Sequence, residues 1–155
     1  MFLNEIYRPE FIKIGLEAED KEEAFEELVD YFCRAARISA REEILEAIRE
    51  RESKMSTGIR QGIAIPHGKT PVVDKLYGIL GVSKTGVEYD ALDGKPVYLL
   101  FLIVAPEKDT EKHLKVLKRL AELLDNPQFY TDLLAQNTAQ DACGIIKKYE
   151  DILIN

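Results

Sequence analysis

The sequence contains only two cysteines and two histidines among its 155 residues, and this scarcity excludes several kinds of protein. Two isolated cysteines, Cys33 and Cys143, cannot build a disulfide framework and are typical of a reducing compartment. No apolar run approaches the ~20 residues that span a bilayer. The first residues also lack the basic and then apolar pattern of a signal peptide. We therefore expect a cytoplasmic protein that does not insert into a membrane.

Positive charge is also in deficit. Lys and Arg total 21 against 28 Asp and Glu, which gives a formal net charge of −7. A compact acidic domain repels nucleic acid and anionic lipid at long range, so we expect neither as a partner. The length corresponds to one domain with a hydrophobic core of its own.

Hydrophobic patterning predicts a single α/β (α+β) domain. Short apolar segments indicate strands at 11–16, 63–65, 76–83 and 97–104. Helical spacing indicates helices at 20–37, 39–51, 110–124, 127–135 and 138–149. Asp20 and Ser39 are each followed three residues later by glutamate, the signature of a capping box. The run 97–104 is apolar on both faces, so the predicted fold is a mixed, mostly central β-sheet flanked by helices on both faces.

The segment 49–69 is locally basic within this acidic chain. It carries five Lys and Arg residues against two glutamates and contains His67. Its three glycines, Gly58, Gly62 and Gly68, permit tight turns whose exposed amides can bind an anion. His67 follows a short apolar strand, so we expect its ring at a strand end, where sites in open α/β sheets lie. The alternative is a surface loop with solvated basic side chains.

His113 falls in the first turn of the helix predicted from residue 110. There it meets unpaired backbone N–H groups and the positive end of the helix dipole, which disfavour imidazolium and attract an anion. The alternative is a partly buried histidine on the flank of an amphipathic helix, with no chemical role.

The sequence gives only weak support for a nucleotide-binding loop, a zinc site or a serine or cysteine nucleophile. The tripeptide 68–70 (Gly-Lys-Thr) ends like a P-loop, but five residues rather than four separate its glycine from Gly62. The two histidines lack the spacing of a zinc site, and no Gly-x-Ser-x-Gly elbow marks a serine nucleophile. Both cysteines fall inside predicted helices, where burial is their usual role. We expect neither a metal nor another cofactor.

A neutral histidine in a basic, glycine-rich pocket suits phosphoryl chemistry. The imidazole of His67 is a nucleophile near neutral pH, and a phosphoryl group is its natural electrophile. The Arg51 guanidinium can clamp two phosphate oxygens, and His113 can add a hydrogen bond. Because the sequence has no nucleotide-binding loop, we expect the donor to be another phosphorylated protein or a small molecule.

Several segments together resemble one known family. Arg51, the run 56–59 (Ser-Thr-Gly-Ile) and the run 62–68 (Gly-Ile-Ala-Ile-Pro-His-Gly) resemble the enzyme IIA domain, fructose/mannitol type, of the bacterial phosphoenolpyruvate-dependent sugar phosphotransferase system (PTS). The stretch around His113 matches the second histidine segment of that family. The resemblance covers residues 5–150, is strongest to the fructose and nitrogen-regulatory branch, and implies a mixed sheet flanked by helices.

The resemblance also implies roles for individual residues. His67 would accept a phosphoryl group on Nε2 from the phosphohistidine of the carrier HPr, or of its nitrogen-branch counterpart. Arg51 and His113 would stabilise the phosphohistidine without being phosphorylated. The residues expected to bind phosphate in the loop beside His67 are Ser56, Thr57 and Gly58. One departure from the family is Arg60-Gln61, which adds charge near the pocket or points outward.

The use of the phosphoryl group stays open. No enzyme IIB or IIC domain is recognised beside 5–150, so we expect a free-standing IIA domain. As a regulator of the nitrogen type, it would bind its target proteins differently when phosphorylated. The amino-acid sequence of segment 49–69 favours this use. As a transport subunit, it would pass the group to an enzyme IIB cysteine for fructose, mannitol or a related sugar. A third possibility is a binding module of the same fold that is never phosphorylated.

Overall fold

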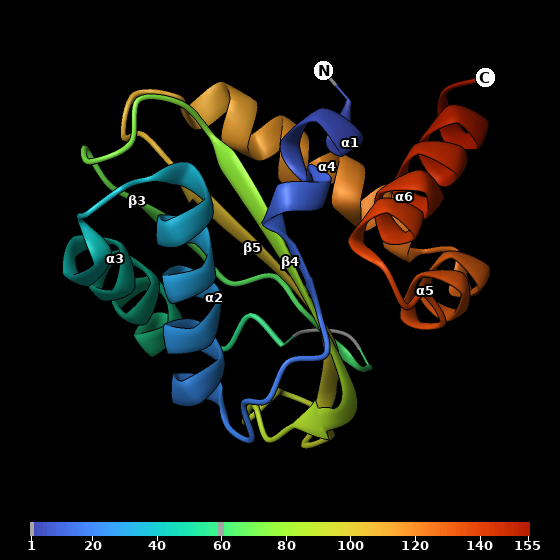
Figure 1. Cartoon of the computed structure of the whole chain (residues 1–155), viewed down its shortest axis with the longest axis horizontal. Coiled ribbons are helices and arrows are strands. Elements are labelled where there is room, and N and C mark those ends of the chain that lie inside the picture. Colours follow the sequence, from blue (N-terminus) through green and yellow to red (C-terminus); the bar gives the residue numbers. More distant parts are fainter. Residues whose placement is uncertain (1, 59–60) are drawn as a thin grey trace.

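A mixed β-sheet forms the centre of the computed structural model, which describes residues 2–58 and 61–155 (Figure 1). Within these residues five strands join one sheet in the order β1-β4-β5-β2, and β3 also pairs with β5. The strands are β1 (Ile12–Ile14), β2 (Ile63–Ala64), β3 (His67–Lys69), β4 (Tyr77–Val87) and β5 (Val97–Ala105). β1 is parallel to β4, β4 is antiparallel to β5, and both β2 and β3 are parallel to β5.

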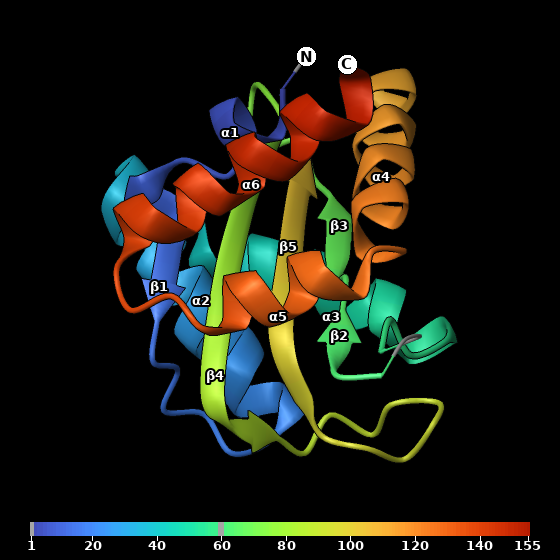
Figure 2. The ribbon, with the colours of Figure 1, turned by 90° about the vertical axis from the view of Figure 1, so that its right-hand side faces the viewer.

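Helices cover both faces of this sheet (Figures 1 and 2). One face carries α2 (Lys21–Ala36) and α3 (Arg41–Lys54). The other carries α1 (Leu3–Ile6), α4 (Thr110–Leu124), α5 (Pro127–Leu134) and α6 (Ala139–Ile154), and a 3₁₀ turn, η1 (Pro9–Phe11), precedes β1. The predicted fold class is therefore confirmed. Across the described ranges, no helix combines the length and the hydropathy that crossing a membrane requires.

Strand β5 supplies both layers of the hydrophobic core. Leu99 and Phe101 pack into the cluster that includes residues of α4, α5 and α6. Leu100 and Leu102 pack into the cluster that includes residues of α2 and α3. Because successive side chains of a strand point to opposite faces, one continuous apolar run fills the space on both sides of the sheet.

Capping side chains begin several helices where the sequence indicates. Asp20 Oδ1 accepts a hydrogen bond of 2.9 Å from the backbone N–H of Glu23 at the start of α2. Asn126 caps α5, with proline at the first helical position, and Thr138 caps α6. These side chains satisfy backbone donors that have no partner inside the helix.

The second predicted capping box is wrong. The N-cap of α3 is Ala40, which makes no side-chain cap, and Ser39 lies outside the helix. The segment between α2 and α3 explains the difference. Arg37 ends α2 in the left-handed conformation (φ 57°), and the first backbone hydrogen bond of α3 runs from the N–H of Ile44 to the carbonyl of Ala40. The N-cap therefore lies one residue later than predicted, and the helix extends three residues further, to Lys54.

Strands β2 and β3 form an interrupted edge strand that presents His67. Both pieces pair with β5, and the break between them falls at Ile65 and Pro66. The N–H of Ile103 donates a 3.0 Å hydrogen bond to the carbonyl of Pro66, which holds the break against β5. The sequence did not predict β3, so His67 is the first residue of a strand rather than the residue after one.

Gly68 permits a close approach between β3 and α3. A Cβ at this position would lie 2.9 Å from the carbonyl carbon of Ala47 and 3.0 Å from the backbone nitrogen of Ile48. Backbone atoms of a helix cannot rotate away, so we expect Gly68→Ala to displace β3. The variant should lower the free energy of unfolding by about 1–3 kcal/mol, the usual cost of overpacking, as measured by urea denaturation.

Gly144→Ala is the matched control. This glycine lies in α6, is exposed, and has no atom within 4 Å of an added Cβ. Alanine is the better helix former, so we expect this variant to raise the free energy of unfolding by about 0.5–1 kcal/mol. A Gly68→Ala protein as stable as the wild type would contradict the tight contact between β3 and α3.

Candidate functional site

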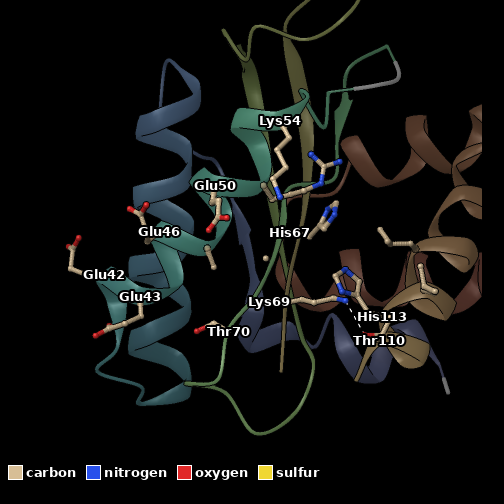
Figure 3. Close-up of a pocket in the computed structure, with 15 residues that line it drawn as sticks. Glu42, Glu43, Glu46, Glu50, Lys54, His67, Lys69, Thr70, Thr110 and His113 are labelled. Carbon is tan, nitrogen blue, oxygen red and sulfur yellow. Dashed lines mark hydrogen bonds between the residues drawn. The ribbon is translucent and has the colours of Figure 1, made fainter. Parts of the chain in front are cut away.

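A groove of about 870 Å³ lies between α3, β3 and the N-terminal half of α4 (Figure 3). Arg51, His67 and His113, which the sequence singled out, all line it. The three residues come from separate elements, so their proximity is a property of the tertiary fold. The prediction that these side chains share one site is consistent with this placement.

His67 is half-buried at the start of β3, with its Nδ1 atom 2.9 Å from the carbonyl oxygen of Ile65. A carbonyl oxygen only accepts hydrogen bonds, so Nδ1 carries the proton and the neutral ring has a free lone pair on Nε2. Burial lowers the pKa of His67 below its ordinary value, and the charges of Arg51 and Lys69 add to this effect. The hydrogen bond to Ile65 opposes the lowering of the pKa, as does Glu52.

His113 lies in the first turn of α4 and is 3% exposed. Its ring centroid is 5.2 Å from that of His67, and the planes meet at 87°, an edge-to-face arrangement (Figure 3). Neither ring nitrogen has a hydrogen-bond partner within the described residues. Burial, with smaller contributions from His67 and Lys69, lowers the pKa of His113 to about 4. This lowering agrees with the expectation of a neutral second imidazole, although its main cause is burial rather than the helix dipole.

Positive side chains lie around the two rings. The Arg51 guanidinium donates a 2.9 Å hydrogen bond from Nη1 to the carbonyl of Met55 at the end of α3. Lys69 Nζ donates a 3.0 Å hydrogen bond to Thr110 Oγ1 and so joins β3 to α4 (Figure 3). Lys54 also lines the groove. Lys69 was not singled out, although residues i and i+2 of a strand share a face and His67 is two residues away.

The other wall of the groove is acidic. Four glutamates of α3 line it, and Figure 3 shows them along the helix, on the side away from His113: they are Glu42, Glu43, Glu46 and Glu50. Residues four apart lie on one face of a helix, so the spacing of Glu42, Glu46 and Glu50 predicts an acidic face on α3. Positive and negative charge thus occupy different ends of one groove.

The three residues expected to bind phosphate lie elsewhere. Thr57 is 3% exposed and does not line the groove, and its hydroxyl bonds to Glu52 (2.6 Å) and Tyr89 (2.7 Å). Ser56 Oγ accepts a 3.2 Å bond from the N–H of Gly58. A Cβ on Gly58 would lie 2.9 Å from the Tyr89 ring. Phosphate binding by these residues stays a prediction.

Two further expectations concern residues at the margin of the site. Arg60, half of the departure from the family, lies outside the described residues. Gln61, the other half, is exposed and lines a separate cavity near Tyr98 and Tyr130 rather than the groove. Within residues 2–58 and 61–155, no three His, Cys, Asp or Glu side chains are grouped as metal ligands.

The chain matches a family of described function. The family model for the phosphoenolpyruvate-dependent sugar phosphotransferase system, EIIA 2, matches residues 5–149. A fructose-specific EIIABC component of the PTS in Bacillus subtilis is 37% identical over 150 residues, which is 97% of this chain and 24% of that protein. The chain thus spans about a quarter of that relative. A nitrogen regulatory protein of Bradyrhizobium diazoefficiens is 34% identical over 148 residues, which is 94% of this chain and 95% of that protein.

A solved structure is similar over nearly its whole length. The crystal structure of the nitrogen regulatory protein IIA-Ntr from Neisseria meningitidis superposes with a TM-score of 0.85 at 32% identity. The superposition covers 93% of this chain and 98% of that one. The family model, which matches residues 5–149, includes all three elements that form the groove.

Burial of His113 predicts a pH dependence of stability. Its pKa is about 4 in the folded protein and about 6.5 in the unfolded chain. Between these values the unfolded chain binds a proton that the folded protein does not, so the unfolding free energy falls as the pH drops from about 6.5 to about 4. The full loss is about 3 kcal/mol, and below pH 4 this contribution no longer changes.

The variant His113→Gln isolates this contribution. Urea unfolding of both proteins between pH 4 and 7.5 gives a difference in free energy from which the shared carboxylates cancel. We expect this difference to change with pH in favour of the variant as the solution becomes more acidic. A difference that is constant across the range would show that His113 titrates normally.

Proposed function

Since the chain belongs to the EIIA 2 family of the phosphoenolpyruvate-dependent sugar phosphotransferase system, we propose that His67 is its phosphoryl carrier. Nε2 of His67 accepts the group from the phosphohistidine of HPr, or of its nitrogen-branch counterpart. The observation that carries this assignment is the 2.9 Å contact of Nδ1 with the carbonyl of Ile65, which leaves Nε2 unprotonated. A low pKa keeps the ring in this nucleophilic form at neutral pH.

The transfer exchanges one phosphorus–nitrogen bond for another. The lone pair of His67 Nε2 attacks phosphorus, and the bond to the donor's histidine nitrogen breaks with its electron pair returning to the donor ring. The His67 ring keeps its proton on Nδ1, and the Ile65 carbonyl stabilises the positive charge that the ring acquires. No proton leaves, so the step needs no general base.

Three groups of the groove stabilise the phosphoryl oxygens in this proposal. The guanidinium of Arg51 presents two parallel donors, and Lys69 supplies a point charge two residues from the nucleophile. His113 has two unpartnered ring nitrogens in a nearly closed position, so a hydrogen bond to phosphate would satisfy a buried donor. His113 itself is too enclosed to meet a protein donor directly.

The outer part of the groove fits a protein partner. The acidic wall of α3 complements a carrier with a basic face, and its potential steers such a carrier toward His67. Leu114, which lines the groove beside His113, is 61% exposed and offers an apolar contact next to the site of chemistry. We propose an HPr-like protein as donor and either an enzyme IIB or a regulatory target protein as the second partner.

We favour the regulatory use. The sequence of segment 49–69 resembles the nitrogen-regulatory branch, and the chain is 34% identical to a nitrogen regulatory protein and 32% identical to the IIA-Ntr structure. In this use the phosphoryl charge on His67 changes which partners dock at the groove. A transport subunit remains the second candidate because of the 37% identity to a fructose-specific component. We propose that residues 5–150 act as one unit in the cytoplasm, which suits the two unpaired cysteines.

The first test separates the two histidines. We expect His67→Ala to accept no phosphoryl group from phosphoenolpyruvate in the presence of enzyme I and HPr or its nitrogen-branch counterpart. His113→Ala keeps the nucleophile and should still be phosphorylated, more slowly. Intact-protein mass spectrometry measures the added phosphoryl mass, and an added phosphoryl group on His67→Ala would reject the assignment.

The second test concerns Arg51. Lysine keeps the positive charge but replaces a bidentate donor by a single point, so we expect Arg51→Lys to slow phosphorylation by about tenfold, the loss of one charge-assisted hydrogen bond. Single-turnover kinetics with phosphorylated carrier measures the rate. Arg8→Lys is the matched control, because Arg8 pairs with Glu10 and does not line the groove. Equal rates for Arg51→Lys and the control would show that Arg51 does not contact the phosphoryl group.

A further inference from the structure

We propose that Glu52 is a positioning residue that fixes the tautomer and orientation of His67 through Thr57 and Ile65. The proposal deepens the function proposed above, because its kinetic consequence rests on His67 being the phosphoryl carrier. Glu52, Thr57 and Ile65 do not line the groove, so each would act on the reaction through His67 and Arg51.

The Glu52 carboxylate is buried and fully engaged. Oε2 accepts the backbone N–H of Thr57 (2.8 Å), and Oε1 accepts the hydroxyls of Thr57 (2.6 Å) and Tyr89 (3.1 Å). Lys21 Nζ lies 3.2 Å from Oε2 and balances the charge. A carboxylate with 5% of its side chain exposed requires this number of partners, so the network holds Thr57 in one position.

A continuous series of hydrogen bonds leads from Thr57 to the reactive ring. The carbonyl of Thr57 accepts a 3.1 Å bond from the N–H of Ile65. The carbonyl of Ile65 in turn receives Nδ1 of His67 at 2.9 Å. Ile65 lies just beyond β2, where its N–H bonds to Thr57, so Thr57 sets the position of this peptide. The orientation of the Ile65 carbonyl decides which ring nitrogen of His67 carries the proton.

The same segment also holds the guanidinium of the groove. Arg51 donates its hydrogen bond to the carbonyl of Met55, which is two residues before Thr57. Glu52 therefore ties the end of α3 to a short segment that contacts both Arg51 and, through Ile65, His67. One buried carboxylate positions two chemical groups that come from different elements.

Tyr89 closes the network from a third element. Its hydroxyl lies 2.7 Å from Thr57 Oγ1 and 3.1 Å from Glu52 Oε1, so its single proton can be donated to either acceptor, and Lys21 Nζ lies 4.8 Å from the centre of its ring. Burial raises the pKa of Tyr89 well above its ordinary value, so the hydroxyl stays protonated and acts as a donor. Gly58 packs directly on this ring, which further restricts the segment that carries Thr57.

The test measures the tautomer of His67 directly. Long-range ¹H–¹⁵N NMR at pH 8, where the ring is neutral, distinguishes a protonated Nδ1 from a protonated Nε2. We expect Nδ1–H in the wild type, and a rise of the Nε2–H form in Glu52→Gln and in Thr57→Val. Phosphorylation of both variants should slow by about 10–100-fold, the range for loss of a group that orients a reactive histidine.

Two further variants separate positioning from general destabilisation. Thr57→Ser keeps the hydroxyl and should retain both the wild-type tautomer and the rate. Ser83→Ala removes an equally buried hydroxyl, which accepts the N–H of Gly86 (2.9 Å) away from the groove, and should destabilise the protein without changing the tautomer. If Glu52→Gln does not fold, the Thr57→Val and Thr57→Ser pair decides. Wild-type ¹⁵N shifts of His67 in Thr57→Val would overturn the proposal.

The two proposals fail in distinguishable ways. The tautomer of His67 is measured without any phosphoryl donor. If wild-type protein acquires no phosphoryl group on His67, the proposed function fails while the NMR result still decides the positioning role. If the wild type is phosphorylated and the variants keep its tautomer, only the positioning role fails.

Discussion

The hydrogen bond between His67 Nδ1 and the carbonyl of Ile65 constrains both the orientation and the protonation of the ring at the centre of the groove. A carbonyl cannot donate, so the ring has its proton inside and its lone pair toward the groove. The bond exists because the edge strand breaks at Ile65 and Pro66, between β2 and β3. In this IIA member of the phosphotransferase system, an interruption of the edge strand thus determines which ring nitrogen of His67 carries the proton.

The electrostatics of the groove follow from unequal burial. Both imidazoles have lowered pKa values, so neither carries positive charge near pH 7. The cationic side chains that line the groove are instead those of Arg51, Lys54 and Lys69. This division keeps a neutral nucleophile beside groups that attract phosphate. The glutamates of α3 lie along the other wall of the groove, where they can attract a basic partner.

The sequence was informative where a pattern is local. The apolar run of β5 and the cap at Asp20 each depend on neighbours within a few residues, and the structure places them as expected. Tertiary contacts account for the rest. The strand β3 has three residues, one of them glycine, and is defined only by pairing with β5. The resemblance predicts that Thr57 binds phosphate, but its hydroxyl partners in the fold are Glu52 and, 32 residues away, Tyr89.

The most direct measurement is the site of the phosphorus–nitrogen bond. Protein labelled with ¹⁵N in its two histidines, phosphorylated through enzyme I and the carrier, shows by ³¹P–¹⁵N coupling which nitrogen holds the group. The geometry of His67 predicts one phosphohistidine, with phosphorus coupled to Nε2 of His67 and with Nδ1 still protonated. Coupling to Nδ1 of that ring, or to either nitrogen of His113, would contradict it.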